Sequence, residues 1–133
     1  MDQKIKILVV EDEEILLTAL AEELKQEGFD VVGAKDGVEG VEKAASEKPN
    51  LILLDLVMPR LDGIGALKQI KANPDTKGIP VVILTNLSDY DKVSDALSLG
   101  AMDYLVKANY RLEELINKIK TVLERKPSSA AGL

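Results

Sequence analysis

Short apolar runs alternate with amphipathic stretches along this sequence, and the alternation predicts an α/β domain in which helices cover both faces of a parallel sheet of five strands. Composition supports this prediction. Of the 133 residues, 46% are hydrophobic but only 3% are aromatic, so Leu, Ile, Val and Ala must form the core. These residues fill the strands of parallel sheets, which are buried on both faces. The length fits one domain.

The first strand and the first helix follow each other directly. Residues 5–10 are apolar and rich in β-branched side chains, which favours a strand. Acidic residues occupy positions 11–14. Residues 15–27 then repeat leucine at helical spacing, and Gly28 stands where the cap of a helix C-terminus belongs. The leucines that indicate this helix are Leu16, Leu20 and Leu24.

The second and third strands are short and flank a helix. Residues 31–34 predict the second strand, and residues 37–48 predict a helix with one apolar face. Pro49 separates that helix from a third strand at 51–54, which consists only of Leu and Ile and stops at Asp55. The apolar face of the helix consists of Val38, Val41, Ala44 and Ala45.

The next part of the chain continues the alternation after a turn from Pro59 to Gly63. Pro74 ends a helix, because the residue before a proline avoids the helical conformation. Ser88 and Asp89 are typical N-cap residues. The predicted elements are a helix at 64–72, a strand at 80–84 followed by Thr85, a helix from 88 or 89 to about 99, and a strand at 102–106 that runs into Lys107.

The last helix has the most regular apolar spacing and is predicted at residues 111–126. Residues 127–133 show no pattern, and we expect a flexible tail there. The domain is therefore predicted to span residues 1–126. Right-handed crossovers between parallel strands favour the strand order 2-1-3-4-5, which is the flavodoxin-like (βα)5 arrangement of a doubly wound sheet.

Four of the five predicted strands end in residues with a functional side chain, namely the pair Glu11 and Asp12, then Asp55, Thr85 and Lys107. Each of these alone is more often a turn, cap or solvated residue. The carboxyl ends of parallel strands meet at one edge of the sheet, however, and ligands bind at that edge in open α/β sheets. The joint occurrence therefore predicts a functional site.

Carboxylates so close together repel one another, and a divalent cation with oxygen ligands would offset the repulsion. Mg²⁺ fits better than Ca²⁺, because the few protein ligands leave room for water. A carboxylate beside Mg²⁺ and a lysine is suited to attack phosphorus. The sequence has no Cys and no His, which excludes disulfides, thiolate chemistry and imidazole catalysis.

Charge and hydropathy limit the possible partners and the location. The formal net charge of −6 speaks against direct binding to nucleic acid or to an anionic membrane surface. Proteins or small ligands are the expected partners. The sequence shows no signal peptide and no apolar run of membrane-spanning length, so we expect a cytoplasmic protein.

The sequence closely resembles the receiver domains of two-component response regulators, of the single-domain chemotaxis or phosphorelay type. The resemblance covers residues 4–126, in the order and spacing of the family. Each motif alone is weak, but all of them together are very specific. The motifs are Val-Val-Glu-Asp-Glu-Glu near the start, Leu-Leu-Asp-Leu-Val-Met-Pro-Arg-Leu-Asp-Gly, Ile-Leu-Thr, Gly-Ala-Met-Asp-Tyr-Leu and Val-Lys.

This resemblance implies that Asp55 accepts a phosphoryl group from the phosphohistidine of a sensor histidine kinase or a phosphotransfer protein. The protein would then catalyse its own phosphoryl transfer and autodephosphorylation while acting mainly in signalling. The Mg²⁺ ligands implied by the resemblance are Glu11, Asp12, Asp55 and the backbone carbonyl of Val57.

The resemblance also implies a switch. Lys107 would pair with the phosphoryl oxygens, Thr85 would move to bond one of them, and Tyr104 would change rotamer with Thr85. The surface formed by the fourth helix, the fifth strand and the fifth helix would then change and control a downstream partner protein.

Some residues depart from the family pattern. Ala108 follows Lys107 where receivers usually have a cis proline, so the peptide there is either trans or strained. Asn86 follows Thr85 where the family favours a smaller residue, and Glu11 replaces an aspartate. A docking module of the same fold that is no longer phosphorylated therefore stays open as an alternative.

Two other classes fit less well. A haloacid-dehalogenase-like phosphatase needs a second aspartate at the position of Val57. A flavodoxin-like electron carrier needs a Ser/Thr/Gly-rich loop after the first strand, where this chain has acidic residues.

Overall fold

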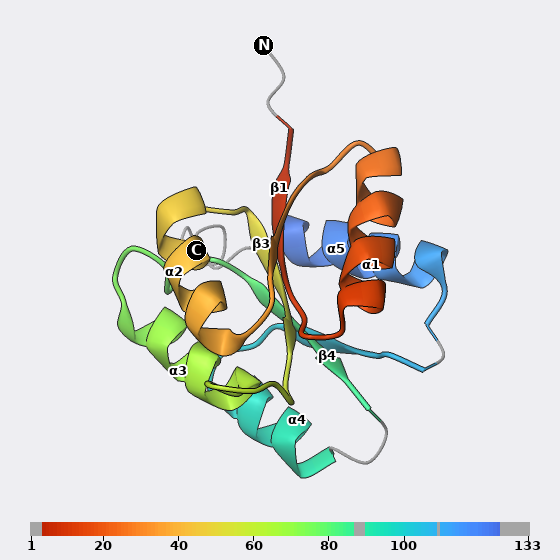
Figure 1. Ribbon diagram of the computed structural model, residues 1–133. Helices are drawn as coiled ribbons and strands as arrows, with labels where there is room; N and C mark the ends of the chain where they lie inside the picture. The colour runs from red at the N-terminus through yellow and green to blue at the C-terminus, as the bar shows by residue number, and fades with distance from the viewer. Residues whose placement is uncertain (1–3, 87–89, 109, 126–133) are drawn as a thin grey trace.

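The predicted alternation of strands and helices is present in the computed structural model, which describes residues 4–86, 90–108 and 110–125 (Figure 1). The strands are β1 (Lys6–Val10), β2 (Asp30–Ala34), β3 (Leu51–Asp55), β4 (Val81–Thr85) and β5 (Asp103–Val106). The helices are α1 (Glu14–Gln26), α2 (Gly37–Glu47), α3 (Gly63–Ala72), α4 (Tyr90–Ser98) and α5 (Leu112–Glu124).

The element boundaries differ only slightly from the predicted ones. The last helix ends at Glu124 rather than at Lys126, because Arg125 has already left the helical conformation. Thr85 belongs to β4 as its last residue instead of following it. The predicted cap residues Ser88 and Asp89 and the predicted tail at 127–133 lie outside the described residues.

The sheet has the strand order β2-β1-β3-β4-β5, and every pair of neighbouring strands is parallel, as predicted. The register aligns the carboxyl ends of the strands. Val10 pairs with Leu54, Asp55 pairs with Leu84, and Thr85 stands opposite Val106 in β5. Residues that follow these strands are therefore held at one edge of the sheet.

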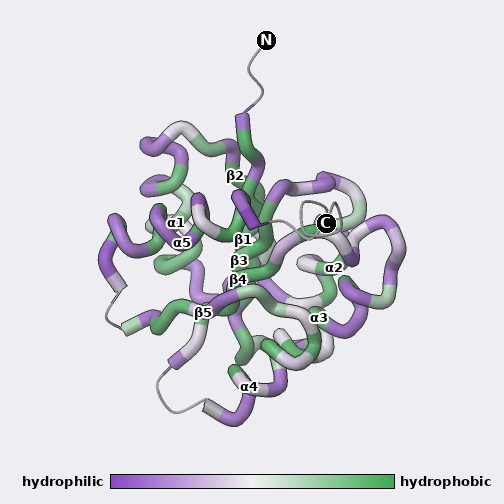
Figure 2. The backbone as a smooth tube through the Cα atoms, turned by 180° about the vertical axis from the view of Figure 1, so that it is seen from behind, coloured by the Kyte–Doolittle hydropathy of each residue, from purple (hydrophilic) through white to green (hydrophobic). Residues whose placement is uncertain are grey.

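Helices cover both faces of the sheet, and each face has its own core. The helices α1 and α5 pack on one face, where Val9, Leu53 and Leu105 point toward them. The helices α2, α3 and α4 pack on the other face, against side chains such as Ile83. The strands are correspondingly hydrophobic in the centre of the molecule, while hydrophilic segments lie at its periphery (Figure 2). None of the described helices is long and apolar enough to cross a membrane.

The predicted apolar face of α2 is partly wrong. Ala45 is exposed, whereas Gly37, Gly40 and Ala44 are the buried residues of this helix. The reason is a close approach to β1, because a Cβ atom at Gly40 would lie 2.9 Å from the Cγ1 atom of Val10. The helix therefore packs through its glycines, which a pattern of apolar side chains does not reveal.

Candidate functional site

The predicted site residues converge at the carboxyl edge of the sheet. Glu11 directly follows β1, Asp55 ends β3, Thr85 ends β4, and Lys107 directly follows β5. Successive side chains of a strand point to opposite faces. By this alternation Asp55, two residues after Leu53, lies on the side of α1 and α5, while Thr85 lies on the side of α3 and α4.

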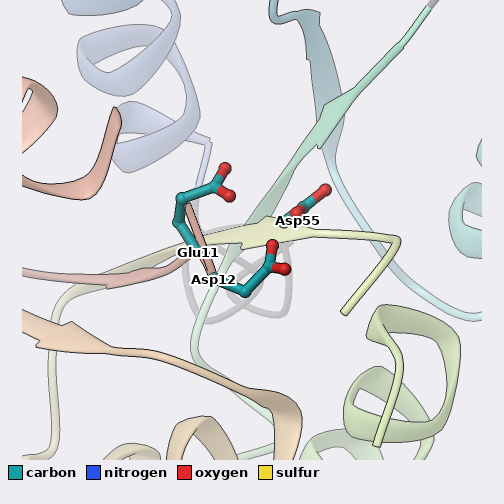
Figure 3. Close-up of side chains that lie close together, drawn as sticks. All are labelled: Glu11, Asp12 and Asp55. Atoms are coloured by element: carbon teal, nitrogen blue, oxygen red, sulfur yellow. The ribbon is translucent and has the colours of Figure 1, made fainter. Parts of the chain in front are cut away.

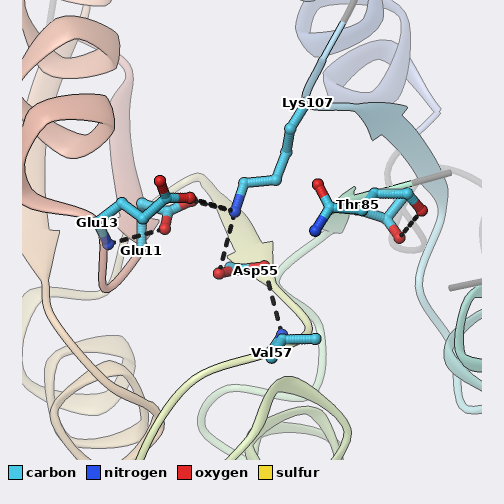
Figure 4. A network of polar contacts seen from close by, with 7 residues as sticks. Glu11, Glu13, Asp55, Val57, Thr85 and Lys107 are labelled. Atoms are coloured by element: carbon cyan, nitrogen blue, oxygen red, sulfur yellow. Dashed lines mark hydrogen bonds and ion pairs between the residues drawn. The ribbon is translucent and has the colours of Figure 1, made fainter. Parts of the chain in front are cut away.

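Lys107 is the centre of an ion-pair network (Figure 4). Its Nζ atom lies 3.0 Å from Glu11 Oε1, 3.2 Å from Glu13 Oε1 and 3.3 Å from Asp55 Oδ2. The Lys107 side chain is only 11% exposed. The peptide bond between Lys107 and Ala108 is trans, since the described residues contain no cis peptide, and the lysine reaches Asp55 in this form.

The carboxylates of Glu11, Asp12 and Asp55 lie next to one another (Figure 3). One oxygen from each lies within 4.8 Å of the others, which is close enough for a shared metal ion. Glu11 and Asp55 are buried, and Asp12 is exposed. Hard oxygen donors of this kind suit Mg²⁺.

Two buried oxygens of this cluster are available to a cation. Glu11 Oε1 and Asp55 Oδ2 accept no hydrogen bond from any described residue, although both lie within ion-pair distance of Lys107 Nζ. The other oxygens of these carboxylates are occupied. Glu11 Oε2 accepts the Glu13 amide at 2.9 Å, and Asp55 Oδ1 accepts the Val57 amide at 3.3 Å. The donor set therefore fits a divalent cation.

Burial and mutual repulsion shift the ionisation of the cluster. Burial raises the pKa of Glu11 to about 7, and the Asp55 charge adds to this, against the opposing effects of the Glu13 amide and Lys107. Burial also raises the pKa of Asp55, again opposed by Lys107. Burial alone would lower the pKa of Lys107, but Glu11, Asp55 and Glu13 outweigh it and raise that pKa. The acids thus hold protons more tightly than free carboxylates do, and Lys107 stays charged.

The loop between β3 and α3 is held against the nucleophile candidate by close backbone packing. A Cβ atom at Gly63 would lie 2.6 Å from the Cα atom of Leu56, so only glycine fits there. The Gly63 amide donates to the Leu56 carbonyl at 2.9 Å, and Asp62 caps α3 by accepting the Gly65 amide at 2.8 Å. By its sequence context Gly63 is an ordinary turn residue, whereas in the structure its packing sets the path of the loop beside Asp55.

The predicted switch residues lie on the same face of the sheet. Ile83 pairs with Tyr104, so Thr85 lies two residues further along the neighbouring strand, at a Cα distance of about 8 Å. The Thr85 hydroxyl donates to the Asn86 carbonyl at 3.1 Å. The Tyr104 ring packs against the core under α3 and α4, and Lys118 Nζ lies 5.8 Å from the ring centroid. Thr85 is therefore bonded to its own loop.

Glu13 is the site residue that sequence analysis did not identify. Its position before α1 suggests only a favourable interaction with the helix dipole. In the structure its side chain reaches back to Lys107. The available signal was its place in the loop that follows β1, two residues after Glu11.

Comparisons with known proteins agree on one family. The model of the response regulator receiver domain matches residues 7–120. Response regulator ArlR of Staphylococcus saprophyticus is 45% identical over 123 residues, which cover 92% of this chain and 54% of that protein. The alkaline phosphatase synthesis transcriptional regulatory protein PhoP of Bacillus subtilis is 41% identical over 126 residues, which cover 94% of this chain and 51% of that protein. The chain thus spans about half the length of these curated relatives.

A solved structure with the same fold comes from Pseudomonas aeruginosa PAO1. It is the receiver domain of the sensor histidine kinase PA1611, with a magnesium ion coordinated in its active site cleft. The TM-score is 0.84 at 28% sequence identity, and the match covers 92% of this chain and 99% of that chain.

Proposed function

We propose, from the premise that this chain belongs to the response regulator receiver domain family, that Asp55 accepts a phosphoryl group from the phosphohistidine of a sensor histidine kinase or a phosphotransfer protein. Membership of this family implies switching by phosphorylation. The observation that carries the assignment to Asp55 is its buried carboxylate at the end of β3, with Lys107 Nζ 3.3 Å away and two further acids beside it.

The transfer is a displacement at phosphorus. A carboxylate oxygen of Asp55 forms a bond to the phosphorus atom as the bond from phosphorus to the histidine nitrogen breaks. The electron pair of that bond stays on the nitrogen, and the ring, which carries a proton on its other nitrogen, leaves as neutral imidazole. Lys107 neutralises charge on the phosphoryl oxygens during transfer. In autodephosphorylation, water attacks the same phosphorus and inorganic phosphate leaves Asp55.

Glu11, Asp12, Asp55 and the Val57 carbonyl would hold Mg²⁺. When bound, the cation supplies positive charge beside the phosphoryl oxygens. The fit of the buried carboxylate oxygens supports this choice, and so does the magnesium ion of the PA1611 receiver domain.

Phosphorylation would switch the surface formed by α4, β5 and α5. The new group brings about two negative charges and strong acceptors to the edge of the sheet. Thr85 would leave the Asn86 carbonyl to donate to the phosphoryl group, and the Tyr104 side chain on the same face would respond. A downstream protein that binds this surface would read the change.

The proposal concerns the receiver domain, which we place at residues 1–126. This domain is acidic, so we expect proteins rather than nucleic acid as its direct partners. PhoP is named a transcriptional regulatory protein, and this chain matches about half of it. Binding of nucleic acid by a longer protein would therefore belong to a segment outside the matched half.

Intact mass spectrometry tests the proposal. The native chain and the Asp55→Asn variant are incubated with a small phosphoryl donor and with a histidine kinase, with and without Mg²⁺. We expect one added phosphoryl group that requires both Mg²⁺ and Asp55. The matched control is Asp75→Asn, an exposed aspartate away from the site, which should be phosphorylated like the native chain. No addition from either donor would favour the docking module, with Ala108 or Asn86 as the cause.

A further inference from the structure

Glu13 approaches Lys107 from a fixed backbone position. The Glu13 amide donates to Glu11 Oε2 at 2.9 Å, and the Glu13 carbonyl accepts the Leu17 amide at 2.9 Å at the start of α1. The side chain is free of the core, with 66% of its surface exposed, and its Oε1 atom lies 3.2 Å from Lys107 Nζ. The backbone thus places a solvent-exposed carboxylate beside a buried lysine.

Carboxylate oxygens already surround the ammonium group of Lys107. The Nζ atom of Lys107 lies 3.0, 3.2 and 3.3 Å from carboxylate oxygens of Glu11, Glu13 and Asp55. Among the described residues, the hydrogen bond that Nζ donates goes to Glu13 Oε1. A phosphoryl oxygen that pairs with this lysine competes with these carboxylates for its positive charge. Glu11 and Asp55 are buried at strand ends, whereas Glu13 can turn into solvent. Glu13 is therefore the contact that yields.

We infer that Glu13 is a counter-ion that a phosphoryl group on Asp55 displaces from Lys107, and that Glu13 thereby lowers the affinity of the site for this group. The inference rests on the proposed function. Two effects act in the same direction, because the contact between Glu13 and Lys107 is lost and the displaced carboxylate stays near a new anion. Glu13 is in this sense a positioning residue for Lys107.

The test uses beryllium trifluoride, an anion that can occupy the place of a phosphoryl group, in the presence of Mg²⁺. Its dissociation constant is measured by calorimetry on the full chain. We expect Glu13→Gln to lower the dissociation constant about twofold to fivefold, which is the range for a largely exposed ion pair. Glu14→Gln is the matched control, because Glu14 is exposed, carries the same charge on the next residue and has no ion pair within the described part of the chain. It should change the constant less than about 1.5-fold, since water and salt screen its charge.

A second variant distinguishes the contact between residue 13 and Lys107 from the negative charge at residue 13. Glu13→Asp keeps the charge but draws the carboxylate back by about 1.5 Å, one carbon–carbon bond, so the contact with Lys107 is lost. We expect this variant to bind beryllium trifluoride more tightly than the native chain but less tightly than Glu13→Gln, because its carboxylate still lies near the anion. Binding like the native chain would show that charge alone acts, and it would overturn the inference.

Three further results of these measurements would each overturn the inference. Equal effects of the Glu13→Gln and Glu14→Gln variants would overturn the inference and leave the proposed function intact. A gain in affinity for Mg²⁺ alone, of the same size as the gain for the anion, would also overturn it, because Glu13 would then act on the cation. A native chain that binds no beryllium trifluoride, as Asp55→Asn is expected to behave, would overturn the proposed function and the inference together.

Discussion

The two sides of the sheet's carboxyl edge are organised differently. On the side of α1 and α5, Lys107 joins Glu11, Glu13 and Asp55 through contacts of 3.0 to 3.3 Å. On the side of α3 and α4, the Thr85 hydroxyl donates to the carbonyl of the next residue. The residues of the charged side are therefore joined by ion pairs, while the Thr85 hydroxyl bonds within its own loop. Charged side chains at the ends of strands are thus brought together by the register of the sheet, whereas a hydroxyl with a partner in its own loop is not drawn into their network.

The largest effect on stability is expected when Lys107, the cation of the charged side, is removed. Lys107→Met leaves the buried carboxylates of Glu11 and Asp55 without their cation, so the free energy of unfolding at pH 8 without Mg²⁺ should fall by about 3 kcal/mol or more. Urea unfolding measures this. The matched control is Lys118→Met, which removes a half-exposed pair with Asp103 and should cost less than about 1 kcal/mol. Equal losses of stability in the two variants would show that the ion pairs of Lys107 stabilise the fold no more than the pair of Lys118 with Asp103 does.

The next effect concerns pH and the cation. Burial raises the pKa of Glu11 to about 7 from an ordinary value of 4.5, and the pKa of Asp55 shifts in the same direction. Because the folded state holds protons that the unfolded state releases, this stability is fully present below about pH 4.5 and is lost as the pH rises through about 7. Without Mg²⁺, the free energy of unfolding should fall by roughly 3 kcal/mol across that range.

Mg²⁺ should reverse this fall, because it binds ionised carboxylates. Urea unfolding at several pH values, with and without Mg²⁺, measures both effects. Glu11→Gln is the control and should flatten most of the pH dependence. A stabilisation by Mg²⁺ that is as large at pH 5 as at pH 8 would contradict the assignment of these acids to the cation.

A smaller effect is expected on the hydroxyl side. Thr85→Val removes one hydrogen bond to the Asn86 carbonyl and should lower the free energy of unfolding by about 1 kcal/mol. Mg²⁺ binding should stay unchanged, because it depends on the charged side. The NMR signals of the Tyr104 ring should no longer shift when beryllium trifluoride is added. An exposed threonine of α5 gives the control variant, Thr121→Val, which should keep the shift. If the Tyr104 signals still shift in Thr85→Val, the response of Tyr104 does not depend on the Thr85 hydroxyl.

The smallest effect on stability is expected for Tyr110, which lies between Lys107 and α5 in the sequence. The Tyr110 hydroxyl donates to Glu23 Oε1 at 3.2 Å, and burial together with the Glu23 charge raises the pKa of Tyr110 to about 12. Tyr110→Phe should cost about 0.5 to 1 kcal/mol and leave phosphorylation of Asp55 unchanged. Ultraviolet titration should lose the tyrosine that ionises near pH 12. In Glu23→Gln, the Tyr110 pKa should fall toward its ordinary value. A loss of phosphorylation in Tyr110→Phe would show that the hydrogen bond from Tyr110 to Glu23 also positions Lys107.

Sequence patterns predicted the order of the elements and the edge at which Glu11, Asp55 and Lys107 meet. They could do so because parallel strands align their carboxyl ends, and each of these residues directly follows or ends an apolar run. The register then brings the side chains together without further information. The contact between Lys107 and Asp55 is of this kind, and it forms although Ala108 replaces the usual proline.

The remaining features depend on tertiary geometry. Ala45 fits an apolar helical pattern, but the close approach of α2 to β1 is made by Gly40, which has no side chain to form a pattern. Gly63 is likewise indistinguishable from a turn glycine until its backbone is seen against Leu56. Glu13 reaches Lys107 across 94 positions of sequence, and only the folded chain shows that contact.

The pairing of β1 and β3 with neighbours on both sides has a consequence for hydrogen exchange. Their backbone amides are covered by two cores and should exchange only when the whole domain opens, whereas β2 and β5 at the sheet edges can open locally. Glu11 directly follows β1 and Asp55 ends β3, which with β4 are the three strands that have neighbours on both sides. The backbone that carries these two acids should therefore stay in place through local opening of β5, whereas Lys107, which directly follows β5, should move with that strand.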